Sequence, residues 1–359
     1  MTYFKEREQR TLKKLDEIKD ELPPFADKFF LAISNITTPL TRLNYAYDLR
    51  LFFYFICFEL GTQTTKMPID LTLEDLEDLT THDVDQFIDW TTMRDSIFSS
   101  TPHTNTERGK ARKISTLRSF FAYYFKLEQL TSNIMPNINM PKIREKPIIR
   151  LERKEIADLI ETVMYGHADM SVRQRAIHYH TKVRDLTIMV FLLSTGIRVS
   201  ELVGLNIGDI NINEELFRIT RKGGKTDILP MPEDLTEQLH DYLRHYLEGA
   251  DRKVPNKQLA LDDNVKSPLF KSLQNQRITV RAVQKLVKKY ADMITLKKIS
   301  PHKLRSTYGT NLYRKTKDIF VVADLLGHKD VNTTRKHYTA MGEDIRREAV
   351  DKVRIIDED

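Results

Sequence analysis

The chain has 359 residues, 40% of them hydrophobic and 30% charged, which is enough for two domains with cores of their own. Its 57 basic and 51 acidic residues give a formal net charge of +6, which favours an anionic partner without identifying one. A single cysteine, Cys57, excludes an intramolecular disulfide and a cysteine-based zinc site, and we expect it to be buried and inert. Met1 to Glu21 is charged throughout, unlike a signal peptide, and no apolar run approaches the roughly 18 residues of a membrane helix. We therefore expect a cytoplasmic protein with no membrane partner.

The first part of the chain predicts a helical module. Helices are expected over 1–22, which Pro23-Pro24 ends, over 25–36, and over 38–58, where aromatic residues are dense enough for full burial. Seven acids and no Lys or Arg follow between Glu74 and Asp89, and we expect this solvated face to turn away from any nucleic acid.

The next stretch reverses its charge. Five bases and no acid occur between residues 108 and 118, and these are Arg108, Lys110, Arg112, Lys113 and Arg118. A plain basic surface is the alternative, but we favour contacts with DNA phosphates. Prolines then accumulate around residues 142–151, which we interpret as a linker between a helical domain over 1–141 and a second domain over 152–342.

The second domain begins with expected helices over 154–165 and 182–194. Gly196 ends the latter, so Arg198 lies in a turn before a short helix, and Glu201 three residues later could pair with Arg198 or simply cap that helix. An alternating run over 216–221, the pair Gly223-Gly224 and a returning run over 226–229 predict a β-hairpin with Lys222 and Lys225 at its tip.

Helices over 230–247 and 279–294 follow, separated by a polar loop over 249–265. Ten bases and one acid lie between Val280 and Lys315, which makes this the most basic surface of the chain. Beside a phosphate site such a surface is a DNA face, and our candidates for DNA contacts here are Arg281, Lys285 and Lys303, with Lys225 from the hairpin.

Residues 300–339 carry the candidate active site. His302 and Arg305 share one face of a helix that Pro301 begins, His328 follows a helix end at Gly327, and Tyr338 lies on a later helical turn. Arg and His donors can meet the negative charge that builds on a phosphate under attack, and Tyr can act as the nucleophile. The pattern favours DNA cleavage by a tyrosine, without a metal.

Two motifs turn this hypothesis into a resemblance. Pro301-His302-Lys303-Leu304-Arg305, Leu325-Leu326-Gly327-His328 and Thr333-Thr334 before Tyr338 resemble the second box of the tyrosine recombinase (phage integrase) family. The first box is similar to Ser194 to Leu202, which contains Arg198. Within that family the chain looks most like the Xer chromosome-dimer recombinases.

The resemblance implies a mainly α fold with a small antiparallel β-sheet or hairpin. A helical core-binding (SAM-like) domain and a tyrosine recombinase catalytic domain would form a C-shaped clamp around duplex DNA, and residues 343–359 would be a tail exchanged between subunits. It also implies that Tyr338 forms a 3′-phosphotyrosine and that Lys222, with Lys225 as the alternative, protonates the leaving oxygen. The implied catalytic set is Arg198, Lys222, His302, Arg305, His328 and Tyr338, supported by Glu201. The covalent link conserves the bond energy, so no cofactor, metal or ATP is expected.

The resemblance further implies a tetramer on two DNA sites, of one protein or with a paralogue, and passage through a Holliday junction. The Xer likeness implies resolution of chromosome dimers at a dif-like site with an FtsK-type DNA translocase as activator. An integrase or transposon recombinase of the same chemistry, a type IB topoisomerase-like enzyme and a catalytically silent DNA-binding relative stay open as alternatives.

Overall fold

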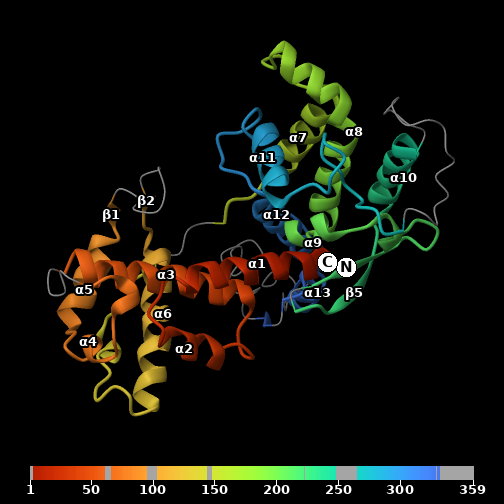
Figure 1. The fold of residues 1–359 in the computed structure, drawn as a ribbon. Coiled ribbons are helices and arrows are strands. Elements are labelled where there is room, and N and C mark those ends of the chain that lie inside the picture. Colours follow the sequence, from red (N-terminus) through yellow and green to blue (C-terminus); the bar gives the residue numbers. More distant parts are fainter. Residues whose placement is uncertain are drawn as a thin grey trace, which may run out of the picture. The chain divides into compact units, whose positions relative to one another are not determined.

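The computed structural model describes residues 3–60, 66–94, 103–143, 148–221, 223–247, 265–328 and 330–331. The chain divides into two compact units, Met1–Lys146 and Pro147–Asp359, each of which is described by itself (Figure 1). Helices dominate both units, and the second adds a three-stranded antiparallel sheet, which confirms the predicted fold class. Within the described ranges, no helix combines the length and apolar character needed to cross a membrane.

The first unit is a set of helices joined by short connections. Its elements are α1 (Tyr3–Lys19), α2 (Ala26–Ala32), α3 (Pro39–Phe58), the 3-10 turn η1 (Pro68–Asp70), α4 (Glu74–Glu77), α5 (Thr81–Trp90), β1 (Met93–Arg94), β2 (His103–Thr104), α6 (Glu107–Lys126) and η2 (Met135–Asn137). Pro39 occupies the first turn of α3, and the Thr38 hydroxyl accepts from the amide of Thr41 at 3.2 Å. The two-stranded pair β1–β2 was not predicted, because each strand has only two residues.

Aromatic side chains form the core of the first unit, where α3 packs against α1 and α6. Phe52 and Phe87 meet edge to face with their ring centroids 5.1 Å apart, and Phe29 and Phe120 do so at 5.2 Å. Cys57 lies among these groups at 2% exposure, and burial raises the pKa of its thiol to about 11. The expectation of a buried cysteine is therefore confirmed.

The second unit contains the candidate site. Its elements are α7 (Arg153–Tyr165), α8 (Val172–Thr195), α9 (Val199–Gly204), η3 (Ile207–Asp209), β3 (Ile210–Asn211), β4 (Leu216–Thr220), β5 (Thr226–Pro230), α10 (Glu233–Leu247), α11 (Val280–Ala291), α12 (Pro301–Thr316) and α13 (Ile319–Leu326). The sheet has the order β3-β4-β5, and β4 pairs with β5 from Leu216 opposite Pro230 to Thr220 opposite Thr226. The predicted hairpin is confirmed, whereas β3 was not predicted.

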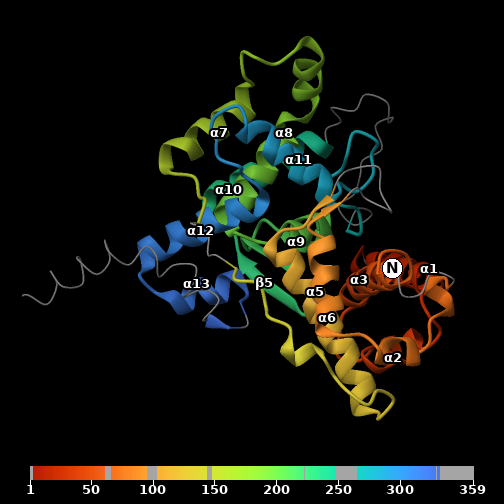
Figure 2. The same ribbon diagram turned by 90° about the vertical axis from the view of Figure 1, so that its left-hand side faces the viewer.

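The long helix α8 is the central element of this unit and packs against α7, α10 and α12 (Figure 2). It begins ten residues before the predicted start at Lys182. The reason is a capping box, in which the Ser171 hydroxyl accepts from the Gln174 amide and the Gln174 side chain accepts from the Ser171 amide at 2.8 Å. A serine followed three residues later by a glutamine is a sequence signal for a helix start. The predicted helix was too short because it did not include this signal.

Two helix ends and one helix start place the candidate residues. Gly196 ends α8 with φ +61°, and Gly327 ends α13 with φ +61°, so both adopt the left-handed conformation that favours glycine. Pro301 lies in the first turn of α12. The predicted helix end at Gly327 and helix start at Pro301 are thus confirmed.

Candidate active site

Arg198 occupies the turn between α8 and α9, as the sequence predicted. It is the residue before α9, and its backbone amide donates to Glu201 Oε2 at 2.7 Å while its Nη1 donates to Glu201 Oε1 at 2.9 Å. The Glu201 carboxylate is 2% exposed, whereas the Arg198 side chain is 37% exposed. Glu201 therefore holds the arginine from the protein interior, while the Arg198 side chain stays partly exposed to solvent.

Arg305 extends from α12 into the interior of the unit, where it is 5% exposed. Its Nη1 donates to the carbonyl of Gly196 at 2.7 Å, and its Nη2 donates to the carbonyl of Leu326. One guanidinium thus joins the end of α8 to the end of α13. Because both acceptors are backbone groups at helix ends, the position of Arg305 depends on the turns that Gly196 and Gly327 make.

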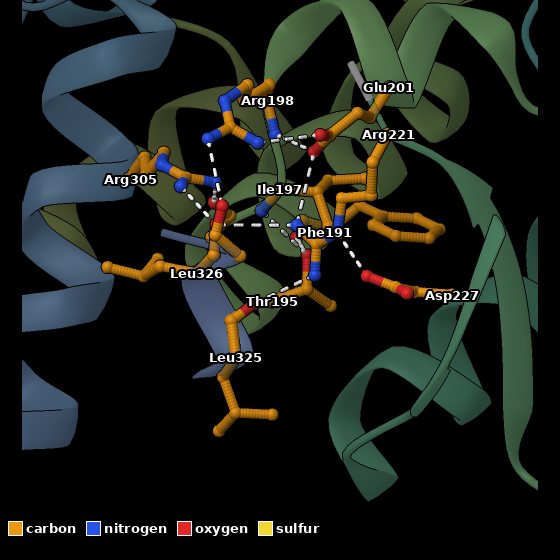
Figure 3. Close-up of polar contacts among 12 residues, drawn as sticks. Phe191, Thr195, Ile197, Arg198, Glu201, Arg221, Asp227, Arg305, Leu325 and Leu326 are labelled. Carbon is orange, nitrogen blue, oxygen red and sulfur yellow. Dashed lines mark hydrogen bonds and ion pairs between the residues drawn. The ribbon is translucent and has the colours of Figure 1, made fainter. Parts of the chain in front are cut away.

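The carboxyl-terminal end of α13 is where three arginines converge (Figure 3). Arg198 Nη2 donates to the carbonyl of Gly327 at 3.3 Å. Arg221 Nη1 joins Arg305 on the carbonyl of Leu326, at 3.3 Å. The last carbonyls of a helix have no partners within the helix and carry its negative dipole end, so they are natural acceptors for cations. Arg198 and Arg221 each lie more than 100 residues away in the sequence from the carbonyl that they bind at this helix end.

Arg221 is the site residue that the sequence interpretation missed. It directly follows β4, is 7% exposed, and donates from Nε to Asp227 Oδ2 at 2.7 Å on the partner strand β5. The hydrogen bond from Arg221 holds the pKa of the Asp227 carboxyl below its usual range. In the sequence, Arg221 looks like one more basic residue at the tip of a hairpin. Its position directly before Lys222 was the one signal that could have identified it.

The two predicted histidines lie at the ends of two different helices, α12 and α13. His302 is exposed in the first turn of α12, one turn before Arg305. His328 directly follows the cap of α13, is half-buried, and donates its backbone amide to the carbonyl of Ala323 at 2.9 Å. The structure therefore places both histidines at helix ends that also position an arginine of the cluster.

Three of the predicted features lie outside the described residues. These are Lys222, Tyr338 and the tail over 343–359. At the hairpin tip, Gly223 and Gly224 turn with φ +90° and +80°, and the exposed ammonium of Lys225 lies 3.5 Å from Asp227. The roles assigned to Lys222 and Tyr338 stay predictions.

The basic residues of α6 do not all lie on the surface. Lys113 is 5% exposed, and its ammonium lies 3.3 Å from Asn105 Oδ1 and 3.8 Å from the buried carboxylate of Asp48. Arg112 also pairs with Asp48. The charge of Lys113 is therefore buried within the first unit beside a carboxylate, and its predicted phosphate contact stays a prediction.

The remaining bases of that stretch divide between exposed and engaged side chains. Arg108 is exposed, and Lys110 lies 3.4 Å from Glu107 on the same helix. Arg118 donates to the carbonyl of Ile138 at 2.6 Å, which ties α6 to the segment that follows it. Arg108 is thus exposed, whereas Arg118 is engaged with the backbone of the first unit.

The predicted DNA-contacting bases of the second unit face outward. Arg281 and Lys285 are exposed and lie four residues apart, so they share the outer face of α11. Lys303 is half-buried beside His302 in the first turn of α12. These residues place positive charge on α11 and on the first turn of α12, the helix that also carries Arg305.

Residues 143–343 match the phage integrase family. The chain belongs to this family, the tyrosine recombinases. It is 32% identical over 339 residues to the tyrosine recombinase XerC of Caldanaerobacter subterraneus subsp. tengcongensis, covering 92% of this chain and 86% of that protein. It is 28% identical over 362 residues to the tyrosine recombinase XerS of Streptococcus agalactiae, covering 95% of this chain and 98% of that protein.

A solved structure has a similar fold. The XerH site-specific recombinase bound to a palindromic difH substrate, in a post-cleavage complex, aligns with a TM-score of 0.59 at 21% identity, covering 87% of this chain and 80% of that one. The predicted relationship to tyrosine recombinases, and among them to the Xer proteins, is confirmed by the family match and by the similarity to XerC.

Proposed function

We propose that this chain is a site-specific DNA recombinase that cuts and rejoins strands through a covalent phosphotyrosine. Membership of the tyrosine recombinase family and likeness to Xer recombinases support this function. The observation that carries it is the cluster of Arg198, Arg221 and Arg305 at the end of α13. Planar guanidinium groups held in advance suit an anion whose charge grows during the reaction.

The charge of the cluster favours a phosphate over a neutral ligand. Three guanidinium groups face two carboxylates, those of Glu201 and Asp227, so these five side chains together carry 3 − 2 = +1 near neutral pH. The exposed ammonium of Lys225, 3.5 Å from Asp227, adds a further positive charge. Arg198 is the accessible member, because two of its five N–H groups bind described residues and its side chain is 37% exposed. A phosphate that approaches Arg198 from solvent would meet an oriented donor without first breaking a buried ion pair.

In the proposed reaction each residue has one role. The Tyr338 hydroxyl attacks the scissile phosphorus, and its proton passes to a base for which His302 is our candidate. Arg198 and Arg305 stabilise the non-bridging oxygens, and His328 adds a donor. Lys222 gives a proton to the departing 5′-oxygen, which leaves the 3′-phosphate on the tyrosine. The freed 5′-hydroxyl of a partner strand then attacks the phosphotyrosine, restores the phosphodiester and releases Tyr338.

We further propose that the biological reaction is the resolution of chromosome dimers at a dif-like site. The support is likeness to the XerC and XerS proteins over nearly the whole chain, and to XerH, which was solved bound to difH DNA. In this proposal the two units clamp duplex DNA, and four subunits exchange strands through a Holliday junction. The 343–359 tail docks on a neighbouring subunit, and an FtsK-type translocase activates the assembly.

The test of the chemistry is covalent capture. A duplex with a candidate dif-like site carries a nick so placed that cleavage releases a short fragment and prevents religation. Wild type should give a denaturant-resistant protein–DNA band in EDTA and without ATP, and Tyr338→Phe should bind the same duplex with near-normal affinity and give no band. An adduct formed by Tyr338→Phe would contradict the assignment of the nucleophile.

Strand exchange separates the related activities. Two duplexes of different length that share the site should give recombinant products and a four-way junction intermediate. Relaxation of supercoils without exchanged products would instead indicate the topoisomerase-like alternative. Tight binding without an adduct on any candidate site would favour a catalytically silent relative.

A further inference from the structure

The contacts of Arg221 exceed what a hairpin base needs. Its guanidinium donates to three acceptors, which are Asp227 Oδ2 at 2.7 Å and the carbonyls of Leu325 and Leu326 at 3.3 Å each. Nη1 also lies 3.7 Å from Glu201 Oε2. A buried guanidinium is costly unless such partners surround it, and these partners come from the hairpin, from α9 and from the end of α13.

Gly327 shows how closely this arginine packs against the cap of α13. A Cβ atom at residue 327 would lie 2.6 Å from Arg221 Cζ, a distance that real side chains do not tolerate. The left-handed φ of +61° independently favours glycine at this position. The turn that carries His328 is therefore fitted against the flat face of the guanidinium.

Arg221 and Arg198 share one carboxylate. Glu201 binds Arg198 through Oε1 and through the backbone amide at Oε2, and the same Oε2 faces Arg221. At the other side, Arg198 donates to Gly327 while Arg221 donates to the two preceding carbonyls. Both contacts that orient Arg198 are thus themselves supported by Arg221 (Figure 3).

We propose that Arg221 is a positioning residue for phosphate binding, which acts through Arg198 by fixing Glu201 and the carboxyl-terminal turn of α13. This inference rests on the proposed recombinase function. Replacement of Arg221 by Met would leave Leu325 without the side-chain donor that the structure gives it. It would also remove one positive charge, so that the three arginines and two carboxylates would go from +1 to 2 − 2 = 0, and Asp227 would lose its arginine partner. The accessible guanidinium would then lose both orientation and part of the local positive potential.

A double-mutant cycle on the rate of adduct formation tests this coupling. Arg221→Met and Arg198→Lys are made singly and together in the full chain, and single-turnover rates are measured on the nicked duplex. We expect Arg221→Met to slow adduct formation by on the order of 10- to 100-fold, as misplacement of a catalytic group does. The double variant should be slower than Arg198→Lys by about 5-fold or less, because Arg221 has little left to orient once Arg198 has been changed.

Matched controls separate positioning from folding. Arg218→Met removes an exposed arginine from β4, the strand directly before Arg221, and its effect should be small and multiply with that of Arg198→Lys. Arg221→Lys keeps the charge without the planar donors and should give a rate between those of wild type and Arg221→Met. Non-covalent DNA affinity should stay within about 3-fold of wild type in all single variants, since the contact at issue orients one group.

The outcomes distinguish the two levels of the proposal. Multiplicative losses in the Arg198–Arg221 cycle, or an Arg221→Met rate equal to wild type, would overturn the positioning role while leaving the recombinase function intact. The absence of any adduct with wild-type protein on every candidate duplex would instead contradict the proposed function itself. If Arg221→Met fails to fold, the same cycle with Arg221→Lys decides, because coupling or its absence is read from the ratio of rates.

Discussion

Gly196→Ala should destabilise the second unit by an amount that the structure allows us to estimate. Gly196 has φ +61°, and an added Cβ would lie 2.3 Å from Cδ1 and 2.9 Å from Cγ of Tyr308, and 3.0 Å from Cδ2 of Leu326. The left-handed backbone costs an alanine roughly 1–2 kcal/mol. Displacement of a packed ring by overfilling costs about 1–3 kcal/mol more. We therefore expect unfolding free energy to fall by about 2–5 kcal/mol, the sum of these ranges.

Gly224→Ala is the matched control for this substitution. Gly224 has φ +80°, but a Cβ there would meet nothing within 4 Å, so only the backbone term of roughly 1–2 kcal/mol applies. The difference between the two variants isolates the clash with Tyr308. Both substitutions add one methyl group in the same unit and leave the net charge unchanged.

Urea unfolding gives the measurement. Far-UV circular dichroism follows the helices of both units, whereas the chain's single tryptophan, Trp90, belongs to the aromatic core of the first unit. The dichroism transition of Gly196→Ala should move to clearly lower urea than that of Gly224→Ala. Adduct formation should also fall in Gly196→Ala, because the Gly196 carbonyl accepts from Arg305 at 2.7 Å. Equal transitions for the two variants would refute the reasoning from the close approach to Tyr308.

Two further predictions concern the carboxylates of the cluster. Glu201→Gln removes the negative charge that faces Arg198 and Arg221 while keeping the shape of the side chain. The rate of single-turnover adduct formation should therefore fall by about 10-fold or more, and the affinity for DNA should change little. A rate within about 2-fold of wild type would show that the carboxylate is dispensable. Asp227 has a lowered pKa in the folded state through its hydrogen bond from Arg221, so its ionised form stabilises the fold above the unfolded pKa of about 3.9, and that contribution is lost as pH falls through the folded pKa. The stability difference between wild type and Asp227→Asn, measured by urea unfolding, should therefore be present at pH 7 and shrink steadily as the pH falls below about 3.9. A difference independent of pH would contradict this linkage.

Local sequence signals predicted the skeleton of the site because they act within a few residues. Pro301 begins α12, Gly327 ends α13, and Gly223-Gly224 turns the hairpin. Each of these residues restricts or permits its own backbone angles, so no distant partner is needed to interpret it. The same holds for the pairing of Arg198 with Glu201, which are three residues apart.

What the sequence did not reveal depends on contacts between distant segments. Arg221 meets the end of α13 across 104 and 105 residues, and no local pattern distinguishes it from a solvent-exposed base. Lys113 is the opposite case, a residue that looked exposed in the sequence and is buried in the structure. Its carboxylate partner, Asp48, lies on α3 rather than on the same helix as Lys113. A run of basic residues therefore predicts positive charge reliably, but it does not tell which members face solvent.

The arginine cluster shows how the fold can hold guanidinium groups in place in advance for the phosphate that we propose it binds. Guanidinium groups that lie close together without partners would repel one another and adopt many orientations. Each would then have to be reoriented during the reaction. Here the end of α13 offers successive carbonyls that carry the negative end of the helix dipole, and Glu201 and Asp227 complete the compensation. The two carboxylates do not cancel the positive charge of the three arginines, and the Arg198 side chain is the partly exposed one. A phosphate that adds its own negative charge would thus complete an arrangement that the protein has already built, which is the physical meaning of preorganisation at this site.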